Sequence, residues 1–391
     1  MTAPVDWFEL TLQHDSEDQD HHTLLARKRR DSPVERLAPF GPDGPEVGMV
    51  YGYDQAAAVL ADTGRFSLDV VEQRYRTVLG SSFLTAAPRA RRALRRVLRE
   101  RLHPGEPEVA RLAGQVAEAR VDTLRTTHGP VDVVEPLAAQ IPARVMVRLL
   151  GLPEQQWRSV AELSAATAGF LRDPRGAVRA ARTLRHRFRA ALRDRHTEVG
   201  DDLMSVLACT DVDGRRLDDA ELTSSLLLLA WAGTETAGPA IANCLYALLT
   251  HPEEAEAVRT GAELLPAAVD EALRWETPVQ LTARRVESGT EIAGVWLPEG
   301  TTVLAHLGAA NRDPRRFDHP DTYAPGRADA GQLAFGHGPH HCLGAALART
   351  EIAGCLRVLL ERFPNVRLAP QAPVPQGRVV RCPRELPVWL H

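Results

Sequence analysis

The sequence predicts a mainly α-helical protein with a small β portion, on three observations. Across roughly residues 90–280, apolar residues recur with the 3.6-residue spacing of amphipathic helices, among strong helix formers. Strand-like stretches are short and lie near the two ends of the chain. No internal repeat or low-complexity linker divides the 391 residues, so we expect one domain over 1–391 with a variable segment at 1–46.

Composition narrows the class of protein. The chain is 44% hydrophobic and 25% charged, which is ordinary for a soluble enzyme. Its net charge of −4 and its acidic N-terminus, which lacks a basic and apolar leader, predict a cytoplasmic protein that binds neither nucleic acid nor membrane. Five scattered cysteines without a C-x-x-C pair indicate reduced thiols and no disulfide framework.

The strand signals come in three places. Residues 47–53, "VGMVYGY", predict an early strand. Residues 290–307 predict a hairpin that turns at Pro298-Glu299-Gly300, and residues 386–390, "LPVWL", predict a last strand.

One long helix is predicted after a capping-box pattern, Asp218-Asp219-Ala220-Glu221, and ends near His251. About 33 residues would span roughly 50 Å. The run from Leu226 to Trp231 is apolar on every side, which predicts burial. Yet the middle of the helix contains a carboxylate, two glycines and a proline, within residues 233–239. A packing kink is one interpretation, and the adjacent Glu235 and Thr236 favour a functional kink.

Residues 333–348, "LAFGHGPHHCLGAALA", place three glycines around Cys342 just before a predicted helix over Leu343–Glu351. Glycines let a flat ligand come close, and backbone N–H groups with a helix N-terminus stabilise a thiolate. Such a thiolate suits an axial ligand to iron. Zinc held by His340, His341 and Cys342 is the alternative, but consecutive residues lack the usual ligand spacing.

The segment from Phe335 to Gly344 resembles F-G-x-G-x-H-x-C-x-G, the haem-binding signature of the cytochrome P-450 monooxygenases. Three further motifs resemble those of the family and follow its order. They are Ala232-Gly233-Thr234-Glu235-Thr236 (A-G-x-[DE]-T), Glu271-Ala272-Leu273-Arg274 (E-x-x-R) and Asn311-Arg312-Asp313-Pro314 (N-R-D-P). The resemblance covers residues 47–390 and is closest to the soluble bacterial members.

This resemblance implies the cytochrome P-450 fold, with haem b (iron protoporphyrin IX) between the long central helix and the helix that follows the cysteine. It makes Cys342 the axial ligand of the haem iron and Glu235 and Thr236 the catalytic pair, with the Thr236 hydroxyl also reaching the carbonyl of Ala232. Gly233 would leave room for oxygen. Apart from the resemblance, Pro239 has no N–H to donate to the Glu235 carbonyl, and we expect this proline to hold the kink open. The remaining cofactor contacts implied are Phe335, Gly336, Gly344, Ala232 and Gly233.

Two further sets of charged residues follow from the resemblance. His340, Arg284 and Arg95 would bind the haem propionates; Arg285 is the near alternative to Arg284, and Arg91 stands where members usually carry histidine. Glu271 and Arg274 would form a buried, structural ion pair with Arg327.

The helix predicted from Arg89 to Arg101 contains seven arginines. A solvated face is the default interpretation, and nucleic acid is disfavoured without interleaved aromatic residues. The resemblance favours a third interpretation, docking of an acidic redox partner by electrostatic steering.

The predicted function is therefore that of a monooxygenase (EC 1.14) which hydroxylates or epoxidises a small, mostly apolar substrate, such as a bacterial polyketide or terpenoid. Oxidative coupling or desaturation on the same fold, and a non-catalytic haem-binding or carrier-recruiting module, are the alternatives. Electrons would come from NAD(P)H through a ferredoxin reductase and a ferredoxin to a monomeric enzyme. Substrate contacts are expected within residues 70–84, 163–171, 279–282 and 381–384, and on the central helix around Leu229.

Overall fold

The computed structural model describes residues 21–37, 46–103, 107–126, 129–195, 200–212, 214–327, 331–370 and 372–390. The chain forms two compact units, one of residues 1–71, 242–342 and 363–391 and one of residues 72–241 and 343–362. A single domain over 1–391 stays a prediction. Most of the variable segment expected at 1–46 lies outside the described residues.

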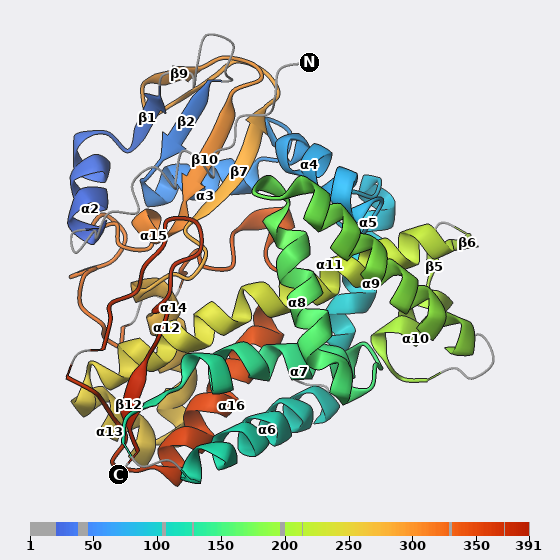
Figure 1. Cartoon of the computed structure of the whole chain (residues 1–391). Helices are drawn as coiled ribbons and strands as arrows, with labels where there is room; N and C mark the ends of the chain where they lie inside the picture. Colours follow the sequence, from blue (N-terminus) through green and yellow to red (C-terminus); the bar gives the residue numbers. More distant parts are fainter. Residues whose placement is uncertain are drawn as a thin grey trace. The chain divides into compact units, whose positions relative to one another are not determined.

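A five-stranded sheet organises the first unit, in the order β1-β2-β10-β7-β3 (Figure 1). Strands β2 and β10 run parallel, whereas the other neighbours pair antiparallel. The strand predicted at 47–53 is present as β2. The bounds are β1 Val34–Leu37, β2 Val47–Val50, β3 Phe66–Ser67, β7 Leu281–Val286 and β10 Thr302–His306.

The hairpin predicted around Pro298–Gly300 is wrong. Strand β9 (Val295–Leu297) turns back on β8 (Thr290–Ile292) through Ala293 and Gly294, both with positive φ. The next strand, β10, pairs with β7 and β2 instead. Local turn residues therefore misled the prediction, because the partner of β10 is set by the sheet and not by its neighbour in the chain.

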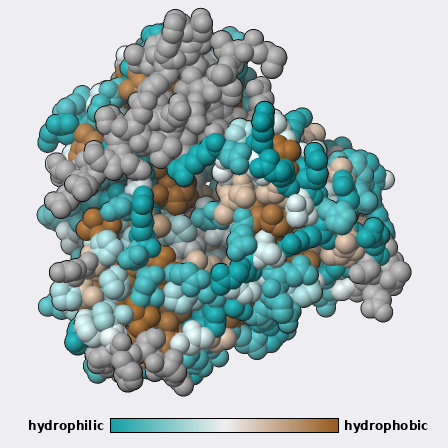
Figure 2. All heavy atoms as spheres, in the orientation of Figure 1, coloured by the Kyte–Doolittle hydropathy of each residue, from teal (hydrophilic) through white to brown (hydrophobic). Residues whose placement is uncertain are grey.

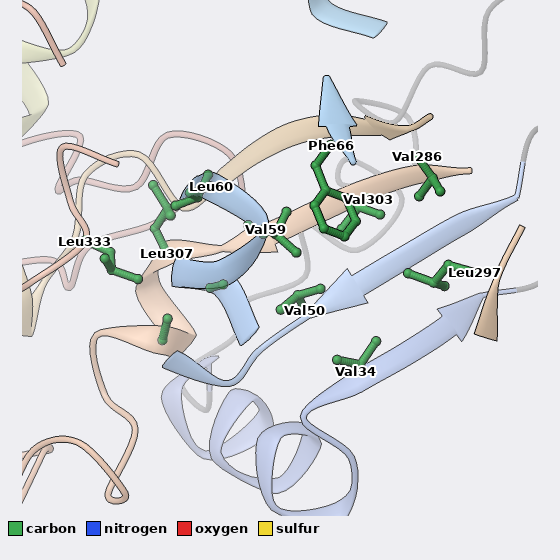
Figure 3. Close-up of a cluster of buried hydrophobic side chains, with 13 residues drawn as sticks. Val34, Val50, Val59, Leu60, Phe66, Val286, Leu297, Val303, Leu307 and Leu333 are labelled. Atoms are coloured by element: carbon green, nitrogen blue, oxygen red, sulfur yellow. The ribbon is translucent and has the colours of Figure 1, made fainter. Parts of the chain in front are cut away.

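The first unit has a core between its sheet and helix α3 (Tyr53–Ala61). Figure 3 shows Val59 of α3 close to Val50, Phe66 and Val303 of the strands, and Leu60 of α3 beside Leu307. Leu333 belongs to the same buried cluster, and its N–H donates to the Asn311 side chain at 2.6 Å. The segment that leads into Cys342 is thus anchored in this core.

The first unit contains further elements besides the sheet and α3. The strand predicted at 386–390 is present as β12 and pairs with β11. The bounds are α2 His21–Asp31, α13 Pro252–Thr260, α14 Leu265–Trp275, α15 Leu307–Ala310, the 3-10 turns η5 Ala262–Leu264 and η6 Gly338–His340, β11 Arg367–Leu368 and β12 Pro387–Trp389.

The second unit is a helical bundle, and residues 90–280 are mostly helical, as predicted. Helix α11 (Asp219–Glu235) packs against α7 (Gln140–Leu149), α8 (Trp157–Ala168) and α9 (Pro174–Arg195), and α16 (Ala345–Arg362) lies along α6 (Pro107–Val121) (Figure 1). No helix in the described ranges is both long and apolar enough to cross a membrane.

Shorter elements complete this unit, and two helices pass from one unit to the other, α4 Asp69–Leu79 and α12 Ala237–Leu249. The remaining bounds are α5 Pro88–Arg101, α10 Leu203–Cys209, β4 Val131–Asp132, β5 Asp211–Val212, β6 Arg215–Arg216, η1 Asp122–Thr126, the π-helical turn η2 Val134–Ala139, η3 Glu154–Gln156 and η4 Gly169–Leu171.

Candidate active site

The loop that carries Cys342 is built on glycines. Gly336 and Gly338 have φ of 73° and 71°, a conformation that residues with a Cβ rarely adopt. A Cβ on Gly338 would lie 2.8 Å from Cα of Ala61 and 2.9 Å from the carbonyl oxygen of Leu60, so this glycine lets the loop pack on the end of α3. The Cys342 N–H donates to the Phe335 carbonyl at 2.8 Å, which closes the loop.

The same loop has open space on its other side. A Cβ placed on Gly336 or on Gly344 would meet no heavy atom within 4 Å. Cys342 is exposed, and α16 begins at Ala345, close to the predicted start at Leu343. The loop therefore presents a thiol beside backbone that a flat ligand can approach.

The predicted long helix is interrupted at Thr236. Its start is as predicted, because Asp218 and Glu221 form a capping box in which each side chain accepts from the other's backbone N–H. Helix α11 ends at Glu235, Thr236 has φ −110° and ψ −31°, and α12 begins at Ala237. Pro239 has no N–H to donate to the carbonyl of Glu235, which explains why the helix breaks here.

Two positions beside this break are exposed, next to a fully buried stretch of α11. Residues 222–230 are all buried, whereas Ala232 and Thr236, one turn apart, are exposed. The Thr236 hydroxyl donates to the Ala232 carbonyl at 3.0 Å, the hydrogen bond expected from the sequence. This face of the helix is therefore open to a ligand.

Two glycines near the break have packing roles. A Cβ on Gly233 would lie 2.2 Å from Cε of Met146 on α7, so this glycine makes room for Met146, and its expected role of leaving room for oxygen stays a prediction. A Cβ on Gly238 would lie 2.9 Å from the Ala138 carbonyl oxygen, so Gly238 allows close approach of the backbone of η2. Contact between the Gly233 backbone and haem stays a prediction.

Glu235, directly before the break, is a half-buried carboxylic acid. Burial raises its pKa to about 7, and within the described residues no cation pairs with it. A carboxyl group with a pKa near 7 is suited to give and take protons near neutral pH.

The ion pair implied by E-x-x-R is present in the first unit. Arg274 donates to Glu271 through Nε and Nη2, both at 2.8 Å, and Arg327 donates to the same carboxylate at 3.1 Å. Arg274 also donates to the carbonyls of Asn311 and Pro320 at 2.8 Å. Glu271 and Arg274 are buried, so the group ties α14 to the loop before the cysteine segment.

A second buried charge network was not anticipated. Glu276 accepts from Arg381 at 2.7 Å and contacts His22 at 2.9 Å. Burial alone would raise the pKa of Glu276, but His22, Arg381 and Arg312 outweigh it and lower the pKa to about 2. Arg381, expected near substrate, is instead buried in this pair. Sequence carries no signal for partners more than 100 residues apart.

Comparison with known proteins assigns this arrangement to a family. A sequence profile described as cytochrome P450 matches residues 175–377. Cytochrome P450 monooxygenase PikC of Streptomyces venezuelae is 37% identical over 358 residues, which are 89% of this chain and 85% of PikC. The chain belongs to the cytochrome P450 family.

Two further similarities extend over most of this cytochrome P450. Mycinamicin IV hydroxylase/epoxidase of Micromonospora griseorubida is 34% identical, over 91% of this chain and 92% of that protein. The solved structure of P450BioI in complex with an acyl carrier protein that carries hexadec-9Z-enoic acid superimposes with a TM-score of 0.83 at 28% identity, covering 94% and 98% of the two chains. The fold is that of the cytochromes P450, and the protein is a haem-thiolate monooxygenase.

Arg284 fits the haem that the family implies. Its side chain is buried, its Nε has no hydrogen-bond partner, and Nη1 reaches the carbonyl of Ala283 at 2.8 Å and the hydroxyl of Thr282 at 3.3 Å. Burial lowers its pKa to about 10, and no carboxylate of the described residues forms an ion pair with it. A buried guanidinium lacking an anion is suited to a propionate.

The other residues expected to bind the haem propionates differ from Arg284 in exposure and in contacts. Arg285 points to the other face of β7, is 41% exposed and lies 4.0 Å from Glu287, so Arg284 is favoured. Arg91 donates to Glu72 at 3.0 Å and to the Leu84 carbonyl at 3.3 Å, so it anchors α5 to α4. Arg95 and His340 are both partly exposed, and their contacts with haem stay predictions.

The zinc alternative finds no support. In the described ranges, no three His, Cys, Asp or Glu side chains come together in a way that could hold a metal ion. Ligation of haem iron by the Cys342 thiolate stays a prediction.

Proposed function

We propose that this cytochrome P450 inserts one oxygen atom from O2 into a small, mostly apolar bacterial secondary metabolite, such as a polyketide or a terpenoid. The observation that carries the proposal is the pair of residues at the helix break. Glu235 has a pKa near 7 and adjoins Thr236, whose hydroxyl lies on the open face. Hydroxylase and epoxidase relatives of this chain act in the same class of chemistry.

When bound, haem supplies the iron at which dioxygen is activated. Cys342 would be its thiolate ligand, and Arg284, His340 and Arg95 would hold its propionates. Phe335, Gly336, Gly344 and Ala232 would contact it. These assignments rest on the motif and on the unpaired guanidinium of Arg284.

Proton supply would come from the chain. Thr236 is held by the Ala232 carbonyl, which leaves its oxygen able to accept a hydrogen bond from water on the open face. Glu235, protonated below its pKa of about 7, would pass protons to that water. Because Pro239 leaves the Glu235 carbonyl without its helical donor, a relay water has an acceptor there.

The test compares Thr234, in the last turn of α11, with Thr236, directly after this helix, because both hydroxyls make the same kind of hydrogen bond. Thr236 and Thr234 each donate to the carbonyl four residues earlier, at 3.0 and 2.9 Å, but Thr234 is buried and Thr236 is exposed. We expect Thr236→Ala to waste NAD(P)H without product and Thr234→Ala to keep coupling near wild type. Product per NAD(P)H consumed is the measurement, and equal losses in both variants would contradict the role of Thr236.

The pH dependence tests Glu235 separately. As a proton donor it must be protonated, so turnover should fall as pH rises through about 7. Glu235→Gln should lower turnover by about 100-fold and abolish that limb of the pH profile. A variant that keeps both the rate and the pH limb would exclude Glu235 as the donor.

We further propose that electrons pass from NAD(P)H through a ferredoxin reductase and a ferredoxin to a monomeric, cytoplasmic enzyme. Arg89, Arg92 and Arg96 lie one to two turns apart on α5 and line an open hollow with Asp211 and Gly214. This face is separate from the one that holds Arg91 and is suited to steer an acidic partner. Arg92→Glu with Arg96→Glu should slow haem reduction by ferredoxin and weaken its salt dependence.

A further inference from the structure

Helix α9 carries a line of positive side chains that the proposed chemistry does not use. Its 22 residues include eight arginines and one aspartate. Six exposed positions, spaced 4, 3, 4, 3 and 4 residues apart, fall on one line of a 3.6-residue helix over about 27 Å. We name them the arginine stripe: Arg175, Arg179, Arg182, His186, Arg189 and Arg193.

The stripe is not neutralised within the described chain. Of its members, Arg179 alone has an ion-pair partner in the described ranges, Asp173 at 3.9 Å, and both of these side chains are exposed. Like charges three and four residues apart destabilise a helix. The helix is held instead by its opposite face, where Ala177, Leu184 and Phe188 are buried. The charges therefore remain available to an external partner.

The distribution of charge limits the size of that partner. Helix α9 carries a net +7 and α5 a net +6, yet the whole chain carries −4, so all other residues together carry −17. A long polyanion that extended beyond these helices would meet a negative surface. A compact partner with a local acidic face is favoured.

The side chains around the stripe indicate the class of partner. The single aromatic residue of α9, Phe188, is buried, so α9 offers no stacking platform for bases. Val178, 38% exposed beside the stripe, gives one apolar contact, too little to insert into a membrane. Hydrophilic side chains cover much of the face shown in Figure 2. A partner helix with carboxylates at the same spacing would match the stripe turn for turn.

We propose that the arginine stripe docks an acidic helix of a partner protein other than the electron donor. Helix α9 packs on α8 and η4, which hold the predicted substrate contacts 163–171, whereas α5 is the proposed ferredoxin side. Helix α10 packs against both α9 and α5, and all three helices belong to the second unit. The partner therefore acts on the substrate side, a placement that rests on the proposed function.

The experiment uses the full-length haem-loaded protein and two helical peptides of identical composition. One peptide carries six glutamates spaced 4, 3, 4, 3 and 4 residues apart, and the other spreads six glutamates around the helix. Fluorescence anisotropy of labelled peptide measures the dissociation constants at low and at physiological salt. We expect the phased peptide to bind about tenfold more tightly than the spread peptide, since only it can match the stripe.

Matched charge reversals locate the site. Arg182→Glu with Arg189→Glu should weaken the phased peptide by at least about tenfold, whereas Arg92→Glu with Arg96→Glu, an equal charge change on α5, should leave it unchanged. The carbon monoxide spectrum of each variant checks that the fold is retained. The proposal is overturned if both peptides bind equally, if the α5 variant weakens binding as much, or if a short DNA duplex or an anionic phosphatidylserine vesicle binds more tightly than the phased peptide. None of these outcomes touches the monooxygenase proposal, because binding is measured without turnover.

Discussion

Buried acids behave in opposite ways in the two compact units. In the first unit, Glu271 and Glu276 each accept hydrogen bonds from arginine, and the pKa of Glu276 is lowered to about 2. In the second unit, Glu235 and Glu351 have no ion-pair partner among the described residues. Burial raises the pKa of Glu235 to about 7 and that of Glu351 well above its usual range.

The presence or absence of arginine partners distinguishes acids that hold the structure together from acids that can exchange protons. A buried carboxylate with two cations stays ionised and holds segments together. A buried carboxyl group without cations stays neutral or titrates near pH 7, which costs stability but permits proton transfer. Arg284 of the first unit is a cation in the same situation as Glu235 and Glu351. Its guanidinium is buried, and no carboxylate of the described residues forms an ion pair with it.

The largest effect is expected when a carboxylate that is paired with two arginines loses its charge. Glu271→Gln would leave Arg274 and Arg327 buried without their anion, and we expect a loss of about 3–5 kcal/mol in the free energy of unfolding. Glu256 and Arg259 repeat the same E-x-x-R spacing on the surface, with a 2.7 Å hydrogen bond between them. Glu256→Gln should leave denaturant unfolding unchanged, and similar losses in the two variants would refute the distinction.

A smaller effect is expected at Arg284, whose proposed anionic partner is a haem propionate and not a side chain. Arg284→Met replaces a buried charged side chain with an apolar one of similar volume. The haem-free variant should therefore be as stable as the haem-free wild type or more so. Haem retention should weaken by about 1.5–3 kcal/mol, the usual contribution of a charge-assisted hydrogen bond. Haem transfer to apomyoglobin measures retention, with Arg285→Met as control, and unchanged transfer would exclude a propionate contact.

The third effect depends on pH and concerns Glu351 of α16. Because its pKa is higher folded than unfolded, it stabilises the fold only while protonated, and stability is lost as pH rises from the unfolded value toward the folded one. The slope is about 1.4 kcal/mol per pH unit within that interval. Glu351→Gln should remove this slope and stabilise the protein at pH 7 relative to wild type, as measured by urea unfolding from pH 5 to 8. An unchanged pH profile would indicate that Glu351 is ionised in the native protein.

The two E-x-x-R pairs show which ion pairs can be predicted from sequence and which cannot. Glu271-x-x-Arg274 and Glu256-x-x-Arg259 have the same spacing on helices of similar length. Sequence predicted the first pair through its place among other motifs. Burial of Glu271 and Arg274, and the arrival of Arg327 from 56 residues away, depend on how α14 packs. The Glu276 network, which joins residues from three distant segments, had no local signal.

Backbone features also differ in whether local sequence predicts them. The capping box at Asp218, the break at Thr236 and the glycine turns of the cysteine loop were predictable because each depends on residues within one or two turns. The pairing of β10 was not, because backbone hydrogen bonds carry no side-chain identity and several strands compete for one edge.

Sequence alone determined the mainly helical class, the cysteine loop, the helix break and the family, since these are written in short motifs and local conformational preference. Tertiary structure alone decided which acids and bases are buried and, apart from the E-x-x-R group, which of them are paired. The physical reason is desolvation: the pKa of Glu235, Glu276 or Arg284 depends on every atom packed around it, and those atoms come from segments far apart in the chain.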